Sequence, residues 1–424
     1  MNTETSMFLE AIVAVLAFTV GIHSTANGET PAQAEPLVLS EVIREALEAN
    51  PELVAAREQL AAASQRITQA RSLDDPTLSV HWWNFPESFN IGQAGNTIIG
   101  LSQKFPFPGK LALREQVASR SAAITEKALR AKELDLIARS KQAYYGLFLA
   151  HKAIQIHHEQ IDLLTQFLQI AIAKFRTGKG SQVDVLKAQV ELSTLHQQLP
   201  VLEQHRETAQ AKINTLLNKD PRIPLGMPEE PRVERFPKDL DELFAMATDV
   251  KPEVKAAELA VQRNEKARAL ANRQYYPDVT VAFERFQNYQ APDGFGAIMA
   301  INLPFAFWTK PKYDAAFQEA SAAVAAARAD LQTVQNLTRF QIRDVLAKVR
   351  ASWEVALLYR TTVLPQAEDS LASARAGYRT GRSDFLNLIE ADRALREFQL
   401  AYYRALVDWQ QRVAELEQVV GREL

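Results

Sequence analysis

Residues 147–200 read LFLAHKAIQIHHEQIDLLTQFLQIAIAKFRTGKGSQVDVLKAQVELSTLHQQLP, and this stretch decides the fold. Before the glycines, apolar side chains recur every seven positions: Leu147, Ile154, Ile161, Leu168 and Phe175. After them, two further seven-residue series run three residues apart: Val185, Leu192, Leu199, Arg206 and Ile213, and Ala188, Leu195, Leu202, Ala209 and Leu216. Seven-residue spacing is typical of a coiled-coil seam, and Gly178–Gly180 suits a tight turn. The stretch therefore predicts two long helices packed as an antiparallel hairpin.

The helix before this turn is expected to be unusually long. No proline occurs from Gly109 to Phe175, a run of 67 residues. At ~1.5 Å per residue, a helix of that length is ~100 Å long. No globular domain of this size requires such a rod.

The chain also contains an internal duplication. Four landmarks recur in the same order: Asn50–Leu53 as Lys251–Val254, Asp75–Val80 as Tyr276–Val281, Lys104–Phe107 as Asn302–Phe305, and Phe175–Lys179 as Tyr378–Arg382. Their offsets are 201, 201, 198 and 203 residues. Solenoid repeats are much shorter, ~20–50 residues, so this is a duplicated domain. We expect a first repeat at 37–220, a proline-rich linker at 221–238 and a second repeat at 239–421.

Each repeat is expected to run in the order helix, β-hairpin, helical hairpin. The opening helix should begin with Ser40 as its N-cap and break at Asn50-Pro51, and its counterpart should break at Lys251-Pro252. The β-hairpins are expected at 77–105 and 278–304, and the helical hairpins at 109–217 and 311–420. The second repeat again shows seven-residue spacing, at Leu357, Leu364, Leu371 and Tyr378.

The four expected strands alternate between apolar and small or polar residues. Leu78, Val80 and Trp82 share one face of the first strand, and Val279, Val281 and Phe283 share one face of the third. Two interpretations fit: a soluble sheet packed on helices, or transmembrane strands with an apolar outer face. Four strands cannot close a barrel, and an open edge is prohibitive in lipid. Three chains would supply twelve strands and place the helical hairpins in a tube beneath the barrel.

Composition excludes several functions. The net charge is −3, which gives no support to a nucleic-acid partner. Cys is absent, so disulfides, cysteine-ligated metals and a cysteine lipid anchor are excluded. We find no phosphate-binding glycine motif and no catalytic constellation, and we expect neither an enzyme nor a cofactor. Residues 1–26 have the apolar run and small residues of an export signal, although no basic residue precedes the run.

The chain resembles the TolC-like outer-membrane factor family over about residues 37–420. The resemblance rests on Leu39–Val42 with Asn50–Leu53, the duplication, the paired hairpins and the turns at Phe175–Gly178 and Tyr378–Gly381. Gln103–Lys110 resembles the strand-to-helix corner of the heavy-metal cation efflux branch, and Leu364–Ala367 does so less exclusively.

The resemblance implies a homotrimeric channel in outer-membrane lipid, with its helical tunnel in the periplasm. It would accept heavy-metal cations from an inner-membrane pump of the resistance-nodulation-division type through a periplasmic adaptor. Multidrug efflux and type I protein secretion remain alternatives. A periplasmic adaptor or coiled-coil scaffold is a rival of another class, against which the duplication and the outward-facing apolar strand residues argue.

The resemblance also implies that the adaptor docks on the two helical turns. The residues in question are Arg176, Thr177, Gly178, Lys179, Ser181, Val183, Arg379, Thr380, Gly381, Arg382, Ser383 and Leu386. The alternative is that each Arg-Thr-Gly sequence is simply a helix C-cap with its glycine at positive φ. Both interpretations are compatible.

Four carboxylates lie just past the turns, and several histidines lie further along the helical hairpins. For each group a structural role is an alternative to a functional one. In a three-fold assembly, Asp184, Asp384, Glu390 and Asp392 could form a periplasmic aperture or gate. Alternatively, each carboxylate interacts favourably with the positive end of the dipole of its own helix. Antiparallel pairing brings His151 to the height of His205, and His157 near Pro200. No two histidines are four residues apart, so we expect solvated or packed histidines and no metal site.

Overall fold

The computed structural model describes residues 36–84, 87–88, 90–231, 238–289 and 292–424. The expected export signal lies outside these residues. The first repeat comprises α1 (Leu39–Ala49), α2 (Pro51–Arg71), β1 (Thr77–Trp83), the short 3-10 helix η1 (Ile91–Gln93), β2 (Asn96–Phe105), α3 (Lys110–Arg176) and α4 (Gln182–Leu216). The second comprises α5 (Leu240–Val250), α6 (Pro252–Arg273), β3 (Val279–Asn288), β4 (Gly294–Ile301), α7 (Lys310–Leu358), the π-helical segment η2 (Tyr359–Val363), α8 (Leu364–Thr380) and α9 (Phe385–Val420).

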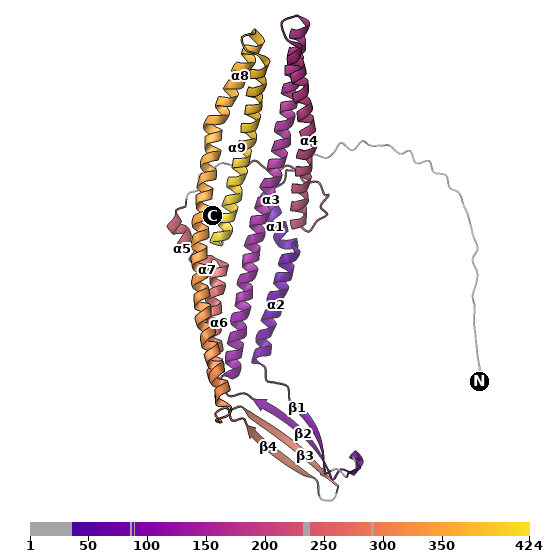
Figure 1. Ribbon diagram of the computed structural model, residues 1–424. Coiled ribbons are helices and arrows are strands. Elements are labelled where there is room, and N and C mark those ends of the chain that lie inside the picture. Colours follow the sequence, from indigo (N-terminus) through magenta and orange to yellow (C-terminus); the bar gives the residue numbers. More distant parts are fainter. Residues whose placement is uncertain (1–35, 85–86, 89, 232–237, 290–291) are drawn as a thin grey trace, which may run out of the picture.

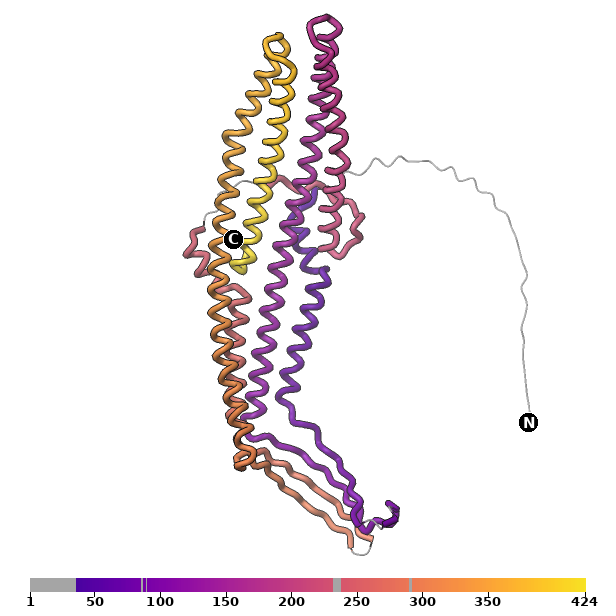
Figure 2. The backbone as a smooth tube through the Cα atoms, viewed as in Figure 1, coloured from indigo at the N-terminus to yellow at the C-terminus, as the bar shows by residue number. Residues whose placement is uncertain are grey.

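The molecule is elongated, with the sheet at one end and both helical turns at the other (Figure 1). In each repeat one long helical rod, α3 or α7–η2–α8, runs most of the length (Figure 2). Helices α2 and α6 lie along the halves of these rods nearest the sheet, and α4 and α9 along the other halves. The expected fold class, mainly α with a small β part and two antiparallel helical hairpins, is confirmed.

The opening helices break where proline predicts. Asn50 ends α1 and caps α2, since its side-chain oxygen accepts from the Glu52 amide at 2.9 Å. Its amide nitrogen donates to the Leu216 carbonyl at 3.0 Å, which ties this break to the end of α4. The expected N-cap at Ser40 is wrong. Helix α1 begins at Leu39, Val38 occupies the cap without a side-chain hydrogen bond, and burial of Val42 and Ala46 sets the helix instead.

The two long rods differ in one respect. Helix α3 is continuous over 67 residues, whereas its counterpart contains the π-helical segment η2, which ends at Val363, two residues before Pro365. Proline has no backbone N–H and cannot donate a hydrogen bond to the carbonyl one turn earlier. The wider π-helical turn of η2 accommodates this missing hydrogen bond. The equivalent residue of α3 is Asp162, which leaves the ladder intact.

The sheet joins the two repeats. Its four strands pair antiparallel in the order β1-β2-β3-β4, so the central β2–β3 pair crosses between repeats. Among the described residues, the outer edges of β1 and β4 pair with nothing. The register places one apolar set on a single face, and these side chains are exposed: Leu78, Val80, Trp82, Ile99, Leu101, Phe105, Val281, Phe283, Phe295, Met299 and Ile301. The other face carries Ser79, Gly100, Ala282, Glu284 and Gly296 among others.

A buried ion pair holds the corner where strands become helices. Lys110, at the start of α3, is only 1% exposed, and its ammonium lies 2.7 Å from an Asp278 carboxylate oxygen. The same oxygen accepts from the Phe107 amide at 2.9 Å. Lys104 lies 3.4 Å from the other oxygen. The motif Gln103–Lys110 therefore contributes to a joint between the repeats.

Candidate functional site

The two turns at the end opposite the sheet share one backbone geometry. Gly178 and Gly381 have φ of +71° and +76°. In the first turn the Lys179 amide donates to the Lys174 carbonyl at 2.9 Å, and in the second the Arg382 amide donates to Gly377 at 2.9 Å. These are the bonds of a helix C-cap built on a left-handed glycine. The predicted positive φ at both glycines is confirmed.

Each turn then opens the next helix with a side-chain cap. Ser181 accepts from the Val183 amide at 3.1 Å at the start of α4. Asp384 accepts from the Asn387 amide at 3.0 Å at the start of α9. Arg176, Thr177, Lys179, Arg379, Thr380 and Arg382 are exposed around these turns, and Ser383 is half-buried.

The surroundings of the two turns differ sharply. Phe175 in the first repeat is 46% exposed, whereas its equivalent Tyr378 is 4% exposed and packs on Phe385. Lys174 contributes to the burial of Tyr378, because its ammonium donates to the Tyr378 carbonyl and lies 4.1 Å from the centre of the Tyr378 ring. Burial raises the pKa of Tyr378 to about 12. The first hairpin thus packs against the second beside the turn that follows Tyr378.

An apolar groove of about 320 Å³ lies between α4 and α9 beside the turns. It is lined by Val183, Leu186, Lys187, Val190, Glu191, Leu386, Ile389 and Arg393. Val183 and Leu386, two of the expected docking residues, come together here from different repeats. The exposed Leu186 and Val190 complete an apolar stripe on α4 at helical spacing, which the sequence analysis missed.

The four candidate gate carboxylates do not share one environment. Glu390 is exposed, Asp184 is half-buried in the first turn of α4, and Asp384 caps α9. Asp392 is 4% exposed and lies between the two hairpins. The structure of one chain therefore brings only Asp392 into a packed seam.

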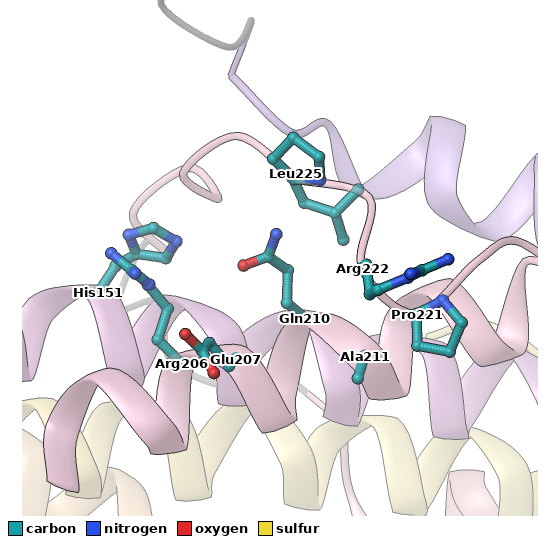
Figure 3. Close-up of a pocket in the computed structure, with 9 residues that line it drawn as sticks. His151, Arg206, Glu207, Gln210, Ala211, Pro221, Arg222 and Leu225 are labelled. Carbon is teal, nitrogen blue, oxygen red and sulfur yellow. The ribbon is translucent and has the colours of Figure 1, made fainter. Parts of the chain in front are cut away.

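His151 lies at the height that antiparallel pairing predicts, whereas His157 contacts Leu195 and not the expected neighbourhood of Pro200. His157 is buried, its Nε2 lies 2.6 Å from the Leu195 carbonyl oxygen, and burial lowers its pKa. His151 lies beside Arg206 at one end of a cavity of about 690 Å³, roofed by residues 221–225 (Figure 3). Burial, and then the charge of Arg206, lowers the pKa of His151. Among the residues that the structure describes, no three His, Asp or Glu side chains gather closely enough to hold a metal ion.

Helices do not provide a membrane span in the described part of the chain. None there is both long enough and apolar enough to cross a bilayer.

Comparison with known proteins agrees with this architecture. The family model described as outer membrane efflux protein matches residues 42–219 and again 243–422. A curated relative, the cobalt-zinc-cadmium resistance protein CzcC of Cupriavidus metallidurans, is 24% identical over 398 residues, which is 92% of this chain and 91% of CzcC.

Solved structures share the fold at lower identity. The outer-membrane channel OprN has a TM-score of 0.76 at 19% identity, covering 90% of this chain and 89% of OprN. VceC of Vibrio cholerae scores 0.74 at 19% identity, covering 91% and 96%, and CusC scores 0.73 at 17% identity, covering 92% and 93%. With two family matches that together span most of its length, the chain belongs to the outer membrane efflux protein family.

Proposed function

We propose that three copies of this chain form an outer-membrane channel whose helical tunnel receives cargo from an inner-membrane pump and a periplasmic adaptor. One observation carries the proposal. A single-layered sheet with two open edges and one exposed apolar face lies at the opposite end of the molecule from two exposed helical turns. Open edges are prohibitive in lipid, so β1 of one copy would pair with β4 of the next until twelve strands close.

The apolar face of the sheet would then face lipid. Val281 and its cross-strand partner Met299 are 45% and 77% exposed on that face, and neighbouring Thr280 lies on the other. Arginine on the lipid face near the bilayer midplane costs ~2–4 kcal/mol. Val281→Arg should therefore lower the free energy of unfolding from lipid by that amount, and Thr280→Arg by much less. Equal losses for both variants would contradict a sheet in lipid.

The turns and the groove between α4 and α9 would take the helical tip of the adaptor. The lining of the groove is mostly apolar and includes the charged residues Lys187, Glu191 and Arg393. A helix laid into it would cover the exposed Val183, Leu186 and Val190.

The docking proposal is tested at the glycines. A Cβ at Gly178 or Gly381 meets no atom within 4 Å, so the expected strain of Gly178→Val with Gly381→Val comes chiefly from the positive φ. We expect a double variant that still folds and assembles but neither cross-links to the adaptor nor supports export. Gly146→Ala, another glycine with open space around it, is the control and should leave both intact. Normal export by an assembled double variant would place docking elsewhere.

The cargo is proposed to be heavy-metal cations, delivered by a pump of the resistance-nodulation-division type. The support is the similarity to CzcC, whose name describes cobalt, zinc and cadmium resistance. Deletion of this protein should sensitise cells to those cations and leave sensitivity to hydrophobic drugs unchanged. The reverse pattern would favour multidrug efflux.

A further inference from the structure

The seam between the two helical hairpins contains a buried polar cluster. Gln160 from α3, Glu191 from α4 and Asp392 from α9 are each at most 5% exposed. All three lie among the apolar residues that pack the four helices together near the turns. Buried polar groups in such a position are costly unless each finds a partner.

The two carboxylates of the cluster are partnered differently. Glu191 pairs with Arg393 and lies 3.9 Å from Arg396. Asp392 forms no ion pair within 4 Å in the described structure. With its amide turned to donate, Gln160 lies 2.9 and 3.1 Å from the two Asp392 oxygens. A neutral amide is a weak counterpart for a buried carboxylate.

The neighbouring helices α3 and α8 place no positively charged side chain within ion-pair distance of the Asp392 carboxylate in the described structure. The facing helix α3 contributes the buried His157, whose pKa is lowered by burial. On α8 the buried residues of the same cluster are Ala367, Leu371 and Tyr378, and burial raises the pKa of Tyr378 to about 12. Arg375 of α8 lies instead against the Phe167 ring, 6.0 Å from its centre, and Glu368 and Asp369 are exposed.

We propose that Asp392 is a proton-binding latch: protonated, it holds the two hairpins packed at their turns, and ionised, it favours their separation. The inference rests on the proposed function, because the hairpins separate at the end where the channel would open. The first repeat has no equivalent latch, because the residue that corresponds to Asp392 there is the exposed Gln189.

The direction of the pH effect follows from proton linkage. Burial raises the pKa of Asp392 to about 7, and Glu191 adds to this while Arg396 and Arg393 oppose it. An acid with a raised pKa binds more protons in the packed state, so packing is most favourable below ~4 and weakens as pH rises through about 7. If separation restores the ordinary pKa, the opening equilibrium rises at most ~30-fold between about pH 5.5 and 8.5.

Cysteine labelling measures this opening, because the natural chain has no cysteine. Ala188→Cys places a thiol in the seam at a residue that is 0% exposed, and Ser193→Cys places one at an exposed position of the same helix. The ratio of their maleimide labelling rates removes the pH dependence that the two thiols have in common. In the assembled full-length protein, the ratio should rise with a midpoint near the Asp392 pKa, by up to ~30-fold.

Three variants locate the titrating group. Asp392→Asn keeps the hydrogen bond to Gln160 and should hold the ratio low at every pH. Glu191→Gln removes a neighbouring charge and should move the midpoint to lower pH. Glu390→Gln, at an exposed carboxylate on the same helix, should leave the rise unchanged.

The outcomes separate the latch from the channel. A flat ratio in the natural sequence, an unaltered rise in Asp392→Asn, or an unmoved midpoint in Glu191→Gln would each overturn the latch. If the oligomer and export persist while the ratio is flat, the latch is wrong and the channel stands. Loss of the oligomer in the natural sequence would count against the channel itself.

Discussion

The turns of the two repeats have nearly the same sequence and backbone but different surroundings. Both end a helix with a glycine at positive φ, and both start the next with a capping side chain. Yet Leu186 of the first repeat is 52% exposed, whereas its equivalent Ile389 is 4% exposed. Phe175 and Tyr378 differ in the same direction. The two repeats thus share the local structure of the turn, but packing between the hairpins buries Tyr378 and Ile389 in the second repeat and leaves Phe175 and Leu186 exposed in the first.

This difference in burial implies different roles for the equivalent side chains of the two repeats. The second is held by Lys174 and by the apolar cluster of four helices. The first leaves an apolar stripe on α4 uncovered in the isolated chain. Where a position is buried in the second repeat and exposed in the first, substitutions should therefore change folding in the second repeat and docking in the first.

The largest difference is expected for a charge placed at the pair Leu186 and Ile389. Ile389→Glu buries an unpaired carboxylate and should lower the free energy of unfolding by ~3 kcal/mol or more. Leu186→Glu should cost less than ~0.5 kcal/mol but abolish adaptor binding. Urea unfolding and adaptor cross-linking measure the two effects. Equal unfolding midpoints for the two variants would contradict the proposed difference in packing between the two positions.

Aromatic truncation should show the next largest contrast. Tyr378→Ala leaves a cavity beside Phe385 and should cost ~3 kcal/mol. Phe175→Ala removes a side chain that is largely in solvent and should cost less than ~1 kcal/mol. Denaturant midpoints of the two purified variants provide the check, and a costlier loss at Phe175 would reverse the assignment.

Lys174 tests what holds the second turn. Lys174→Met keeps the aliphatic packing but removes both the charged hydrogen bond to the Tyr378 carbonyl and the contact with its ring. The expected cost is ~1–2 kcal/mol. Lys179→Met, at the exposed turn, is the matched control and should be silent. A silent Lys174→Met would mean that apolar packing alone positions Tyr378.

The smallest effect should be equal in both repeats. Gly178→Ala and Gly381→Ala each place a Cβ at positive φ in open space, so each should cost ~1 kcal/mol. Thermal unfolding of the two single variants supplies the measurement. Unequal costs would show that the backbones of the turns are not equivalent after all.

Much of this fold could be predicted because its signals are local. Seven-residue spacing around Gly178 predicts the hairpin, and alternation from Thr77 onward predicts strands. Proline at residues 51 and 252 predicts the helix breaks. The cap at Ser40 failed because burial of neighbouring Val42 and Ala46 overrode capping preference.

The seam between hairpins could not be predicted in the same way. Gln160, Glu191 and Asp392 meet only after two repeats 203 residues apart have packed together. Their one sequence signal is position, because each is adjacent to an apolar residue at seven-residue spacing. These neighbours are respectively Ile161, Leu192 and Ala391, the last of which begins the spacing Ala391, Phe398 and Ala405. Polar residues beside a seam are common, so that signal alone does not distinguish a buried cluster from a solvated helix face.

The mass of the assembled protein in detergent tests the central claim most directly. Four strands with two open edges require partners, and three copies supply the twelve strands that close a barrel. We expect native mass spectrometry of the mature protein to show a trimer. A stable, monodisperse monomer that retains its strand structure would contradict the channel proposed here.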